Sequence, residues 1–524
     1  MNPSAPYPRP SWLDEALFYE IYPQSFADSN ADGIGDIPGI TAKLDYIKDL
    51  GCNAIWLNPC FDSPFKDAGY DVRDYTKVAP RYGTNSDLAA LFDAAHQRGM
   101  HVILDLVPGH TSEEHEWFLR SGEADRNAYS DRYIWTDSWI AGGDGLPFIG
   151  GESPRNGTYI LNFFKCQPAL NYGFAHPSRS WQKPALGPEA KATCDAMVDV
   201  MRFWLSLGAD GFRVDMADSL VKRDDDGKPY TIRTWQYMFA QIRPEFPEAA
   251  FVSEWGRPDE SLAAGFDMDF YLDWRWDGIP NGYNMLLRNT DDPLSREGDR
   301  SYFNADSGTP ISDFLGEYEP RLRHAESLGG TFDFITCNHD TARVAPRLSD
   351  REIALAYCTL FALPGVPFLY YGDEIGMRYR ALPSKEGGYV RTGSRTPMQW
   401  APASNEGGSY LPTDPSDDAP NVAGEQADEH SLWHIVRAML HVRSDCAALQ
   451  PRGTFHAIEH GRVLVFERSA AGKRVVVAVN PSRECKALQL PNGKYRDLFN
   501  IGEIGIDGTR LRMGVQSFAV LEAE

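Results

Sequence analysis

An arginine and an aspartate lie two residues apart in the stretch Gly-Phe-Arg-Val-Asp-Met-Ala-Asp, residues 211–218. Because successive side chains of a strand alternate between its two faces, Arg213 and Asp215 point to the same side of an otherwise apolar strand. A guanidinium group beside a carboxyl group favours the ionised form, so the pattern predicts that Arg213 keeps Asp215 anionic. An anionic carboxylate at the end of a buried strand could act as a nucleophile.

Other apolar runs also end in residues that could do chemistry. Glu254 lies between Ser253 and Trp255, and partial burial against the indole is expected to raise its pKa, as a general acid requires. Taken singly, each such residue is more often a helix cap or a satisfied core residue, but together they predict one site. The remaining members are Asp105, His110, His339 and Asp340. Two carboxyl groups in one pocket, one ionised and one protonated, can cleave a glycosidic bond.

Other chemistries lack essential parts. The sequence has no serine beside a base and no glycine-rich phosphate cradle after a strand. The eight cysteines show no CxxC spacing, so we expect buried free thiols in a reducing cytoplasm and no zinc site.

The charge of the chain limits its partners. The formal net charge of -23 disfavours nucleic acid and anionic membranes, so a neutral or cationic small ligand is expected. The chain has no basic segment followed by an apolar run at its start and no run of about 18 apolar residues. These features predict a cytoplasmic protein, as a monomer or homodimer.

Eight short apolar runs are the candidate strands that position these residues. They span residues 16–23, 51–59, 101–108, 209–216, 249–255, 268–274, 332–338 and 366–374. Helical patterns lie between most of them, so parallel pairing and a closed (β/α)₈ barrel (TIM barrel, an α/β fold) are expected. Periodicity alone does not exclude an open, doubly wound sheet. In a barrel the carboxyl ends of all strands meet at one mouth, where the polar residues would gather.

The clearest helical pattern covers residues 85–99. Its apolar positions are Leu88, Leu91, Phe92 and Ala95, with Asn85 or Ser86 as the expected cap and Gly99 as the stop.

Two regions depart from the strand and helix alternation. Residues 111–185, after the third strand, are rich in Gly, Pro, Asn and aromatics, and we interpret them as an inserted domain B. Residues 446–524 contain short alternating runs that predict a C-terminal antiparallel β-sandwich, domain C. The barrel, domain A, would then comprise residues 1–110 and 186–445.

A calcium loop is predicted after the first strand, in DSNADGIGD. Side-chain oxygens alternate there and a backbone carbonyl can complete the set, as in calcium-binding loops. The expected ligands are Asp28, Asn30, Asp32, Ile34 and Asp36. Gly39 stands where an EF-hand has its bidentate glutamate, which argues against that module, and a loop without metal is the alternative.

Five motifs in order give the chain a resemblance to the α-amylase family, glycoside hydrolase family 13: DLVPGH (105–110), QPALN (167–171), GFRVDMA (211–217), SEWG (253–256) and CNHD (337–340). The resemblance implies a barrel with an inserted domain B and a retaining double displacement on α-glucosides. It further implies that Asp215 is the nucleophile, Glu254 the general acid/base and Asp340 the third carboxylate. The same −1 subsite would be lined by His110, Arg213 and His339.

Within that family, three stretches resemble the exo-acting group of α-glucosidases, oligo-1,6-glucosidases, sucrose isomerases and trehalose synthases: KDAGYDVRDY (66–75), YYGDEIGM (370–377) and RTPMQW (395–400). The resemblance implies that Asp67 and Arg395 close the pocket over the non-reducing end and that Tyr70 stacks on the glucose ring. It also implies Ca²⁺, or Mg²⁺, in the loop after the first strand.

The expected function is therefore a retaining exo-acting α-glucosidase that hydrolyses short α-glucosides, including small oligosaccharides. The reaction would pass through a covalent glucosyl-enzyme intermediate, with transglucosylation as a possible side reaction. The alternative is a glucosyltransferase or isomerase of the trehalose synthase or sucrose isomerase type. A non-catalytic carbohydrate-binding protein on the same barrel is more remote, since all three carboxylates are present.

Three positions depart from the family pattern. Gly109 stands where the family usually has Asn before the histidine, here His110. This argues against the amylase-type calcium between the barrel and domain B. In the motif QPALN, Ala169 replaces the usual acid. Met216, directly after the expected nucleophile, fits neither of the side-chain types that accompany α-1,4 or α-1,6 preference. The linkage preference is therefore open.

Overall fold

The computed structural model describes residues 7–271, 282–402 and 409–523. Eight parallel strands in these ranges form a closed barrel, in the order β1-β12-β11-β10-β9-β8-β5-β2. The strands are β1 (Phe18–Ile21), β2 (Ala54–Leu57), β5 (His101–Leu106), β8 (Gly211–Val214), β9 (Ala250–Ser253), β10 (Met268–Phe270), β11 (Thr331–Ile335) and β12 (Val366–Tyr370).

The barrel confirms the predicted fold class. Each of the eight apolar runs contains one strand, and β1 pairs with both β2 and β12, so the sheet is closed rather than open. The last three residues of the sixth run, 272–274, lie outside the described residues.

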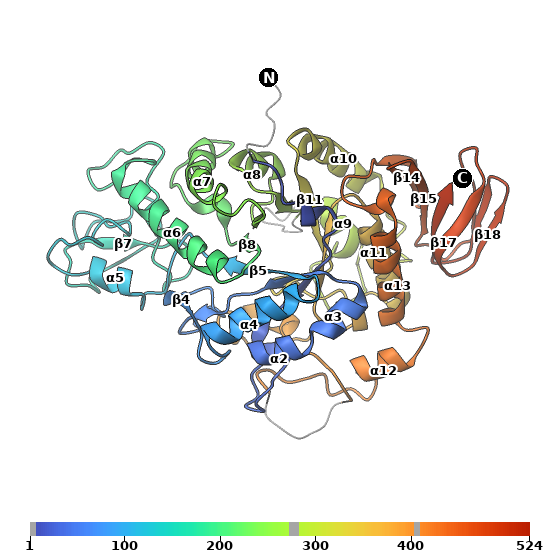
Figure 1. Ribbon diagram of the computed structural model, residues 1–524, viewed down its shortest axis with the longest axis horizontal. Helices are drawn as coiled ribbons and strands as arrows, with labels where there is room; N and C mark the ends of the chain where they lie inside the picture. The colour runs from blue at the N-terminus through green and yellow to red at the C-terminus, as the bar shows by residue number, and fades with distance from the viewer. Residues whose placement is uncertain (1–6, 272–281, 403–408, 524) are drawn as a thin grey trace.

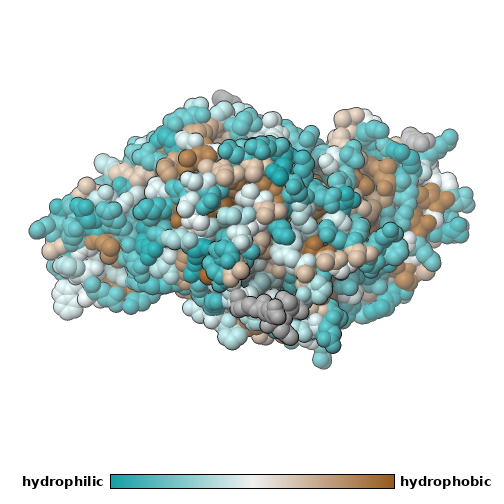
Figure 2. Space-filling view, turned by 60° about the horizontal axis from the view of Figure 1, so that its bottom comes forward, coloured by the Kyte–Doolittle hydropathy of each residue, from teal (hydrophilic) through white to brown (hydrophobic). Residues whose placement is uncertain are grey.

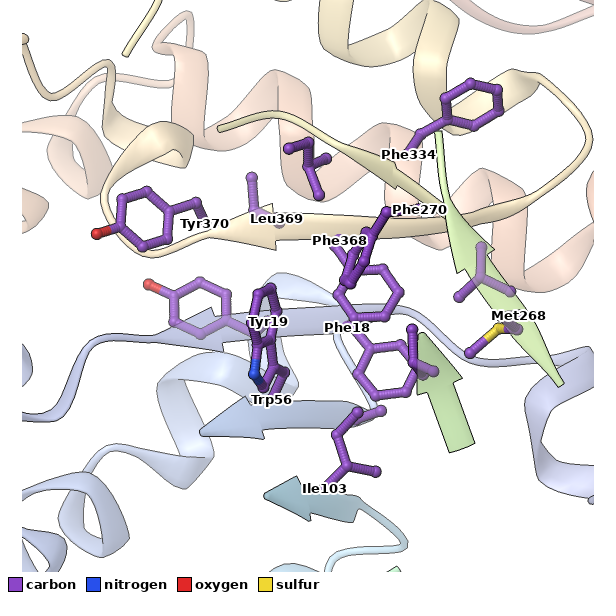
Figure 3. Packing of buried hydrophobic residues seen from close by; sticks show 14 of the residues in the cluster. Phe18, Tyr19, Trp56, Ile103, Met268, Phe270, Phe334, Phe368, Leu369 and Tyr370 are labelled. Atoms are coloured by element: carbon purple, nitrogen blue, oxygen red, sulfur yellow. The ribbon is translucent and has the colours of Figure 1, made fainter. Parts of the chain in front are cut away.

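Large side chains fill the barrel interior (Figure 3). The rings of Phe18 and Phe368 stack with centroids 4.2 Å apart, and Phe270 packs edge-on against Phe368 at 5.1 Å. Trp56 closes the layer from β2, at 5.4 Å from Phe270. Near-continuous apolar strands are needed because both faces of this parallel sheet are covered. The barrel is thus a packed core, and its polar chemistry is confined to the strand ends.

Helices cover the outside of the barrel (Figure 1). They are α2 (Ile37–Ala42), α3 (Leu44–Leu50), α4 (Asn85–His96), α6 (Pro188–Ser206), α7 (Pro229–Ile242), α8 (Pro258–Ala264), α10 (Ser312–Ser327), α11 (Asp350–Ala362) and α13 (Leu432–Asp445). In α4 the four predicted apolar residues are buried, but the predicted cap is wrong. Thr84 caps the helix through a capping box with Asp87, because its hydroxyl reaches the third backbone N–H of the first turn.

A compact segment lies between β5 and α6 and extends beyond α6 at the left of Figure 1. It contains α5 (Glu116–Ser121) and a two-stranded antiparallel sheet of β6 (Phe148–Gly150) and β7 (Thr158–Ile160). Ile134, Ile160 and Phe174 belong to a small core of its own. The predicted limits of domain B, residues 111 and 185, remain predictions.

The C-terminal part consists of two antiparallel sheets, at the right of Figure 1. The larger contains β13 (His456–His460), β14 (Leu464–Ala470), β15 (Lys473–Asn480), β17 (Tyr495–Ile501) and β20 (Ser517–Ala523). The smaller contains β16 (Lys486–Gln489), β18 (Ile504–Asp507) and β19 (Arg510–Met513). Val476, Leu511 and Leu521 pack between them, which confirms the predicted C-terminal β domain.

The remaining sequence predictions concern thiols and surface. All eight cysteines are free, but Cys485 is exposed and Cys166 half-buried, so the prediction of uniformly buried thiols is wrong for these two. Figure 2 shows a face that is largely hydrophilic, with small scattered hydrophobic patches. Within the described ranges, none of the helices combines the length and apolar character needed to span a bilayer.

Candidate active site

Arg213 is the centre of a cluster of charged residues at the carboxyl ends of the barrel strands. Its Nη1 donates to Asp105 Oδ1 at 2.9 Å and to Asp215 Oδ1 at 3.1 Å, and its Nη2 lies 2.8 Å from Glu254 Oε2. Arg213 is on β8, Asp105 on β5, and Asp215 and Glu254 directly follow β8 and β9. The parallel register therefore brings three carboxyl groups onto one buried guanidinium group.

The electrostatic balance at Asp215 differs from the sequence prediction. Burial and the adjacent Glu254 raise the pKa of Asp215 well above its usual value, and Arg213 opposes them without reversing the direction. Arg213 does lower the pKa of Asp215, as the prediction that it keeps Asp215 anionic requires, but the net shift is upward. A pair of closely placed carboxyl groups suits a site that needs one acid and one nucleophile.

Glu254 is oriented by the backbone that follows β8. The N–H of Met216 donates to Glu254 Oε2 at 2.9 Å, and Met216 has a left-handed backbone with φ 41° and ψ 46°. A methionine at positive φ is strained, so this turn is held by its surroundings. Met216 therefore contacts the candidate general acid through its main chain.

Asp340 lies between two arginines of the loop that follows β12. Arg391 Nη1 and Arg395 Nη2 each donate to Asp340 Oδ1 at 2.9 Å. Burial raises the pKa of Asp340, but the positive charges of Arg391 and Arg395 outweigh it and lower the pKa below its usual range. Asp340 is therefore ionised over the whole range in which the protein would work.

Asp67 contacts Gln167 and Arg391. Gln167 Nε2 donates to Asp67 Oδ2 at 2.7 Å, and Arg391 Nη2 lies 3.7 Å from Oδ1. Arg395 instead binds Asp340 because its Nε is fixed on the carbonyl of His339 at 2.8 Å. Burial raises the pKa of Asp67 to about 6, although Arg391 and Gln167 oppose it.

His339 is buried in a network that starts on β1. Its Nδ1 lies 2.9 Å from Glu20 Oε1, and its Nε2 lies 2.6 Å from the hydroxyl of Tyr70. The rings of His339 and Tyr70 stack at 5.4 Å, and the Tyr70 hydroxyl donates to Asp105 Oδ2 at 3.1 Å. Burial lowers the pKa of His339 well below its usual value, so the imidazole is neutral.

His110 is held from both sides. Its Nε2 lies 3.1 Å from the carbonyl oxygen of Tyr70, and its Nδ1 lies 3.1 Å from Asn162 Nδ2. Lys222 Nζ donates to Asn162 Oδ1 at 2.6 Å, and burial lowers the pKa of Lys222 to about 8. A Cβ on Gly109 would lie 2.6 Å from Asn162 Nδ2, so a larger residue there would displace the amide that contacts His110.

The structure brings all nine predicted catalytic and substrate-binding residues to one end of the barrel. Sequence reasoning missed Glu20, Gln167 and Arg391. Glu20 had the same signal as Arg213, a charged residue inside an apolar strand run. Gln167 is the first residue of the motif QPALN. Arg391 lies in an irregular loop, where no sequence pattern distinguishes it from other arginines.

The predicted calcium loop forms a series of tight turns. Asp28 Oδ1 accepts from the N–H of Ala31 at 2.8 Å, Asp28 Oδ2 from Gly33 at 2.7 Å, and Asp36 Oδ1 caps α2 through Gly39 at 2.7 Å. The hard oxygen donors suit calcium in type. In the described part of the chain, however, no three His, Cys, Asp or Glu side chains surround a common metal position. The calcium site remains a prediction.

Comparison with known proteins agrees with this geometry. The model of the alpha-amylase catalytic domain matches residues 20–273 and 313–451. A trehalose synthase/amylase, TreS, from Mycolicibacterium smegmatis is 35% identical over 489 residues, which cover 83% of this chain and 76% of the relative. An oligo-1,6-glucosidase from Parageobacillus thermoglucosidasius is 29% identical over 559 residues and covers 92% of each chain. The crystal structure of XgtA, an alpha-glucosyl transfer enzyme, superposes with a TM-score of 0.78 at 27% identity and covers 99% of this chain and 100% of its own.

Proposed function

Because the chain belongs to the alpha-amylase family, whose members act on glucosides, we propose that it is a retaining exo-acting α-glucosidase for short α-glucosides. The observation that supports this most directly is the cluster of buried charged residues at the barrel mouth. Asp67, Asp215 and Glu254 are each at most 7% exposed, and two arginines bind the carboxylate of Asp340. A site of this kind would accept one sugar end rather than a threaded polymer.

The proposed first step uses the two carboxyl groups on Arg213. Asp215 attacks the anomeric carbon while Glu254 protonates the departing glycosidic oxygen, so the C–O bond to the leaving group breaks and a glucosyl-Asp215 ester forms. In the second step Glu254 removes a proton from water, which attacks the same carbon and releases the sugar with retained configuration. A retaining enzyme needs closely spaced carboxyl groups, and the contacts of Asp215 and Glu254 with one guanidinium group support this proposal.

The other residues are proposed to hold the sugar. Asp340, ionised and fixed by two arginines, would bind ring hydroxyls and favour the distorted sugar of the transition state. His339 and His110 are both neutral, because burial lowers the pKa of His110 to about 3, so each can donate and accept one hydrogen bond. Tyr70 would pack against the ring, and Asp67 would bind the non-reducing end.

Transfer to a second sugar is the other candidate outcome. The observation that favours it is the low exposure of Asp215 and Glu254, 7% and 5%, since restricted water access prolongs the glucosyl-enzyme. XgtA is described as an alpha-glucosyl transfer enzyme, and TreS as a trehalose synthase/amylase. A trehalose synthase or sucrose isomerase would use the same carboxyl groups and differ in the group that accepts the glucosyl unit.

Product analysis with maltose, isomaltose, sucrose, trehalose and nigerose separates these outcomes. A hydrolase releases glucose, first as the α-anomer, from at least one of the five sugars. An isomerase or transferase yields new disaccharides with little free glucose. Purified protein that leaves all five sugars intact would contradict both candidates.

We also propose that the loop Asp28–Asp36 binds Ca²⁺, or Mg²⁺, as a structural ion. Its five predicted oxygen donors include three carboxylates, which attract a divalent cation. Millimolar CaCl₂ is then expected to raise the melting temperature relative to EDTA, and the rise should disappear in Asp32→Ala. Equal melting temperatures in calcium and EDTA would reject the site.

A further inference from the structure

Glu20 is a fully buried carboxyl group inside the barrel that has no part in the proposed steps of the reaction. It lies on β1, in register with Trp56 on β2 and Tyr370 on β12. Asn58 Nδ2 donates to Glu20 Oε1 at 3.2 Å, and His339 Nδ1 lies 2.9 Å from the same oxygen. Glu20 Oε2 has no hydrogen-bond partner among the described residues. Glu20 therefore contacts the proposed sugar site through His339.

A chain of hydrogen bonds leads from His339 to Arg213. His339 Nε2 lies 2.6 Å from the Tyr70 hydroxyl, which donates to Asp105 Oδ2 at 3.1 Å. Asp105 also accepts from Trp56 Nε1 at 3.1 Å and from Arg213 Nη1 at 2.9 Å. Burial raises the pKa of Asp105 to about 6, so the group is ionised at pH 7. All three of these contacts come from donors, and an ionised carboxylate accepts them without a proton of its own.

These contacts decide where the protons lie. The Tyr70 hydroxyl has a single proton and donates it to Asp105, so the 2.6 Å contact needs a proton on His339 Nε2. Burial lowers the pKa of His339 well below its usual value, and a neutral imidazole carries one proton. His339 Nδ1 is therefore an acceptor. The proton of the 2.9 Å contact must then come from Glu20, as a neutral carboxyl group.

The surroundings of Glu20 favour this neutral form. Burial raises the pKa of Glu20 well above its usual value, and the negative charge of Asp105 adds to the rise. Asn58 and Arg213 oppose the shift without reversing it. An ionised Glu20 would also leave a charged Oε2 without a donor in a buried position, which is costly.

From this geometry we propose that Glu20 is a positioning residue: as a neutral carboxyl group it donates to His339 Nδ1 and keeps the single proton of the imidazole on Nε2. The inference rests on the proposed function, in which His339 binds the sugar. His339 Nε2 lies 3.6 Å from Asp340 Oδ2, on the side assigned to the sugar hydroxyls. An ionised Glu20 would draw the proton to Nδ1, and His339 would then present an acceptor to the sugar in place of a donor.

Two substitutions of Glu20 separate a lost donor from a lost charge. Glu20→Gln keeps a donor for His339 Nδ1, since Asn58 can turn its amide so that its unpartnered Oδ1 faces the new NH₂ group. Glu20→Met has a similar length and no donor. On whichever of maltose, isomaltose, sucrose, trehalose and nigerose is consumed fastest, Glu20→Gln should keep kcat/KM within about threefold of wild type, and Glu20→Met should lower it by about 10- to 100-fold.

A control variant and a double-mutant cycle test whether the effect passes through His339. Asp333→Leu makes the same acid-to-apolar change elsewhere in the barrel and should leave kcat/KM within about threefold of wild type. In a His339→Ala background, Glu20→Met should change kcat/KM by no more than about twofold, because the group that it positions is gone. A full loss in both backgrounds would show that Glu20 does not act through His339 and would overturn the inference.

Infrared spectroscopy detects the proton on Glu20 without any substrate. The difference spectrum of wild type and Glu20→Gln at pH 7 should show the loss of the carbonyl stretch of a protonated carboxyl group. Loss of a carboxylate stretch instead would show that Glu20 is ionised and would overturn the inference. If Glu20→Met does not fold, as judged by its melting temperature, this spectrum decides.

The kinetic outcomes are distinct. An unchanged kcat/KM in a folded Glu20→Met variant overturns the inference while the proposed function stands. Equal losses in Glu20→Gln and Glu20→Met also overturn it, because a donor to His339 would then not be what the site needs. A wild-type protein that consumes none of the five sugars overturns the proposed function and the inference together.

Discussion

The barrel holds two pairs of buried carboxyl groups that differ in their neighbours. Asp215 and Glu254 share the guanidinium group of Arg213 at the strand ends. Asp269 on β10 and Asp333 on β11 are fully buried, and within the described residues neither forms an ion pair. Asp269 Oδ1 accepts from the hydroxyl of Ser253 at 2.7 Å, whereas neither oxygen of Asp333 finds a hydrogen-bond partner in the described ranges.

Burial raises the pKa of carboxyl groups in both pairs. It raises that of Asp269 to about 8 and that of Asp333 well above its usual value, as it does for Asp215. A raised pKa in a barrel strand is therefore not a sign of catalysis by itself. Asp215 and Glu254 differ from Asp269 and Asp333 because they share one cation, Arg213, and lie at the mouth of the barrel. Substitutions at three positions test this distinction.

The largest effect is expected for Asp215→Asn. Removing the nucleophile should lower kcat by about 10⁴-fold or more on the preferred glucoside, because no covalent intermediate can form. The same chemical change in the other pair, Asp333→Asn, is expected to leave kcat within about threefold of wild type. A folded Asp215→Asn variant with more than a tenth of wild-type activity would remove the distinction between the two pairs.

A smaller effect is expected for Asp269, which supports the turn that carries Glu254. Asp269 Oδ1 accepts from the backbone N–H of Trp255 at 3.1 Å and of Gly256 at 3.3 Å. Asp269→Ala removes this acceptor and should lower kcat by about 10- to 100-fold, since leaving buried N–H groups without an acceptor costs about 1–3 kcal/mol. Asp269→Asn keeps an acceptor and should recover most of the rate.

The loss of rate in Asp269→Ala on two different substrates tests whether Asp269 acts through Glu254. An aryl glucoside with a good leaving group needs little protonation by Glu254, so its loss of rate should be smaller than that of maltose. Equal losses on both substrates would mean that Asp269 does not act through Glu254.

The smallest effect is a change in stability at Asp333. Its folded-state pKa is raised above the unfolded value, so its contribution to stability is fully present at low pH and is lost as pH rises. Asp333→Asn has no such group to ionise, and its melting temperature should exceed that of wild type by more at pH 8 than at pH 5, with a difference of a few degrees. A difference that is independent of pH would show that Asp333 binds no more protons in the folded than in the unfolded protein over this range.

Strand runs and motif spacing predicted the barrel and brought Asp215, Glu254 and Asp340 to one end, since these follow from period-two patterning and chain order. The same signal, an acid inside an apolar run, also marks Glu20, Asp269 and Asp333, and sequence alone does not separate these. The distinction depends on which strand neighbours supply a cation, and that requires the three-dimensional register.

Two features of the site could not be predicted, each for a physical reason. The net direction of the Asp215 pKa shift depends on how burial and Glu254 compare with Arg213, and these magnitudes come from the packed structure. The contact of Arg391 with Asp67 depends on an irregular turn with three positive φ angles, which has no period to detect.

The closure of the barrel by β1 and β12 has a consequence for the order of folding. Glu20 belongs to the first strand, yet it binds His339, and Arg395 binds Asp340 from beyond the last strand. Contacts between such distant parts of the chain are slow to form, because the loop between them must first be ordered. During synthesis β1 has no second neighbour until β12 has left the ribosome. The sugar pocket is therefore among the last parts of the molecule to assemble, and a chain that ends before Arg395 would possess the nucleophile without the pocket around it.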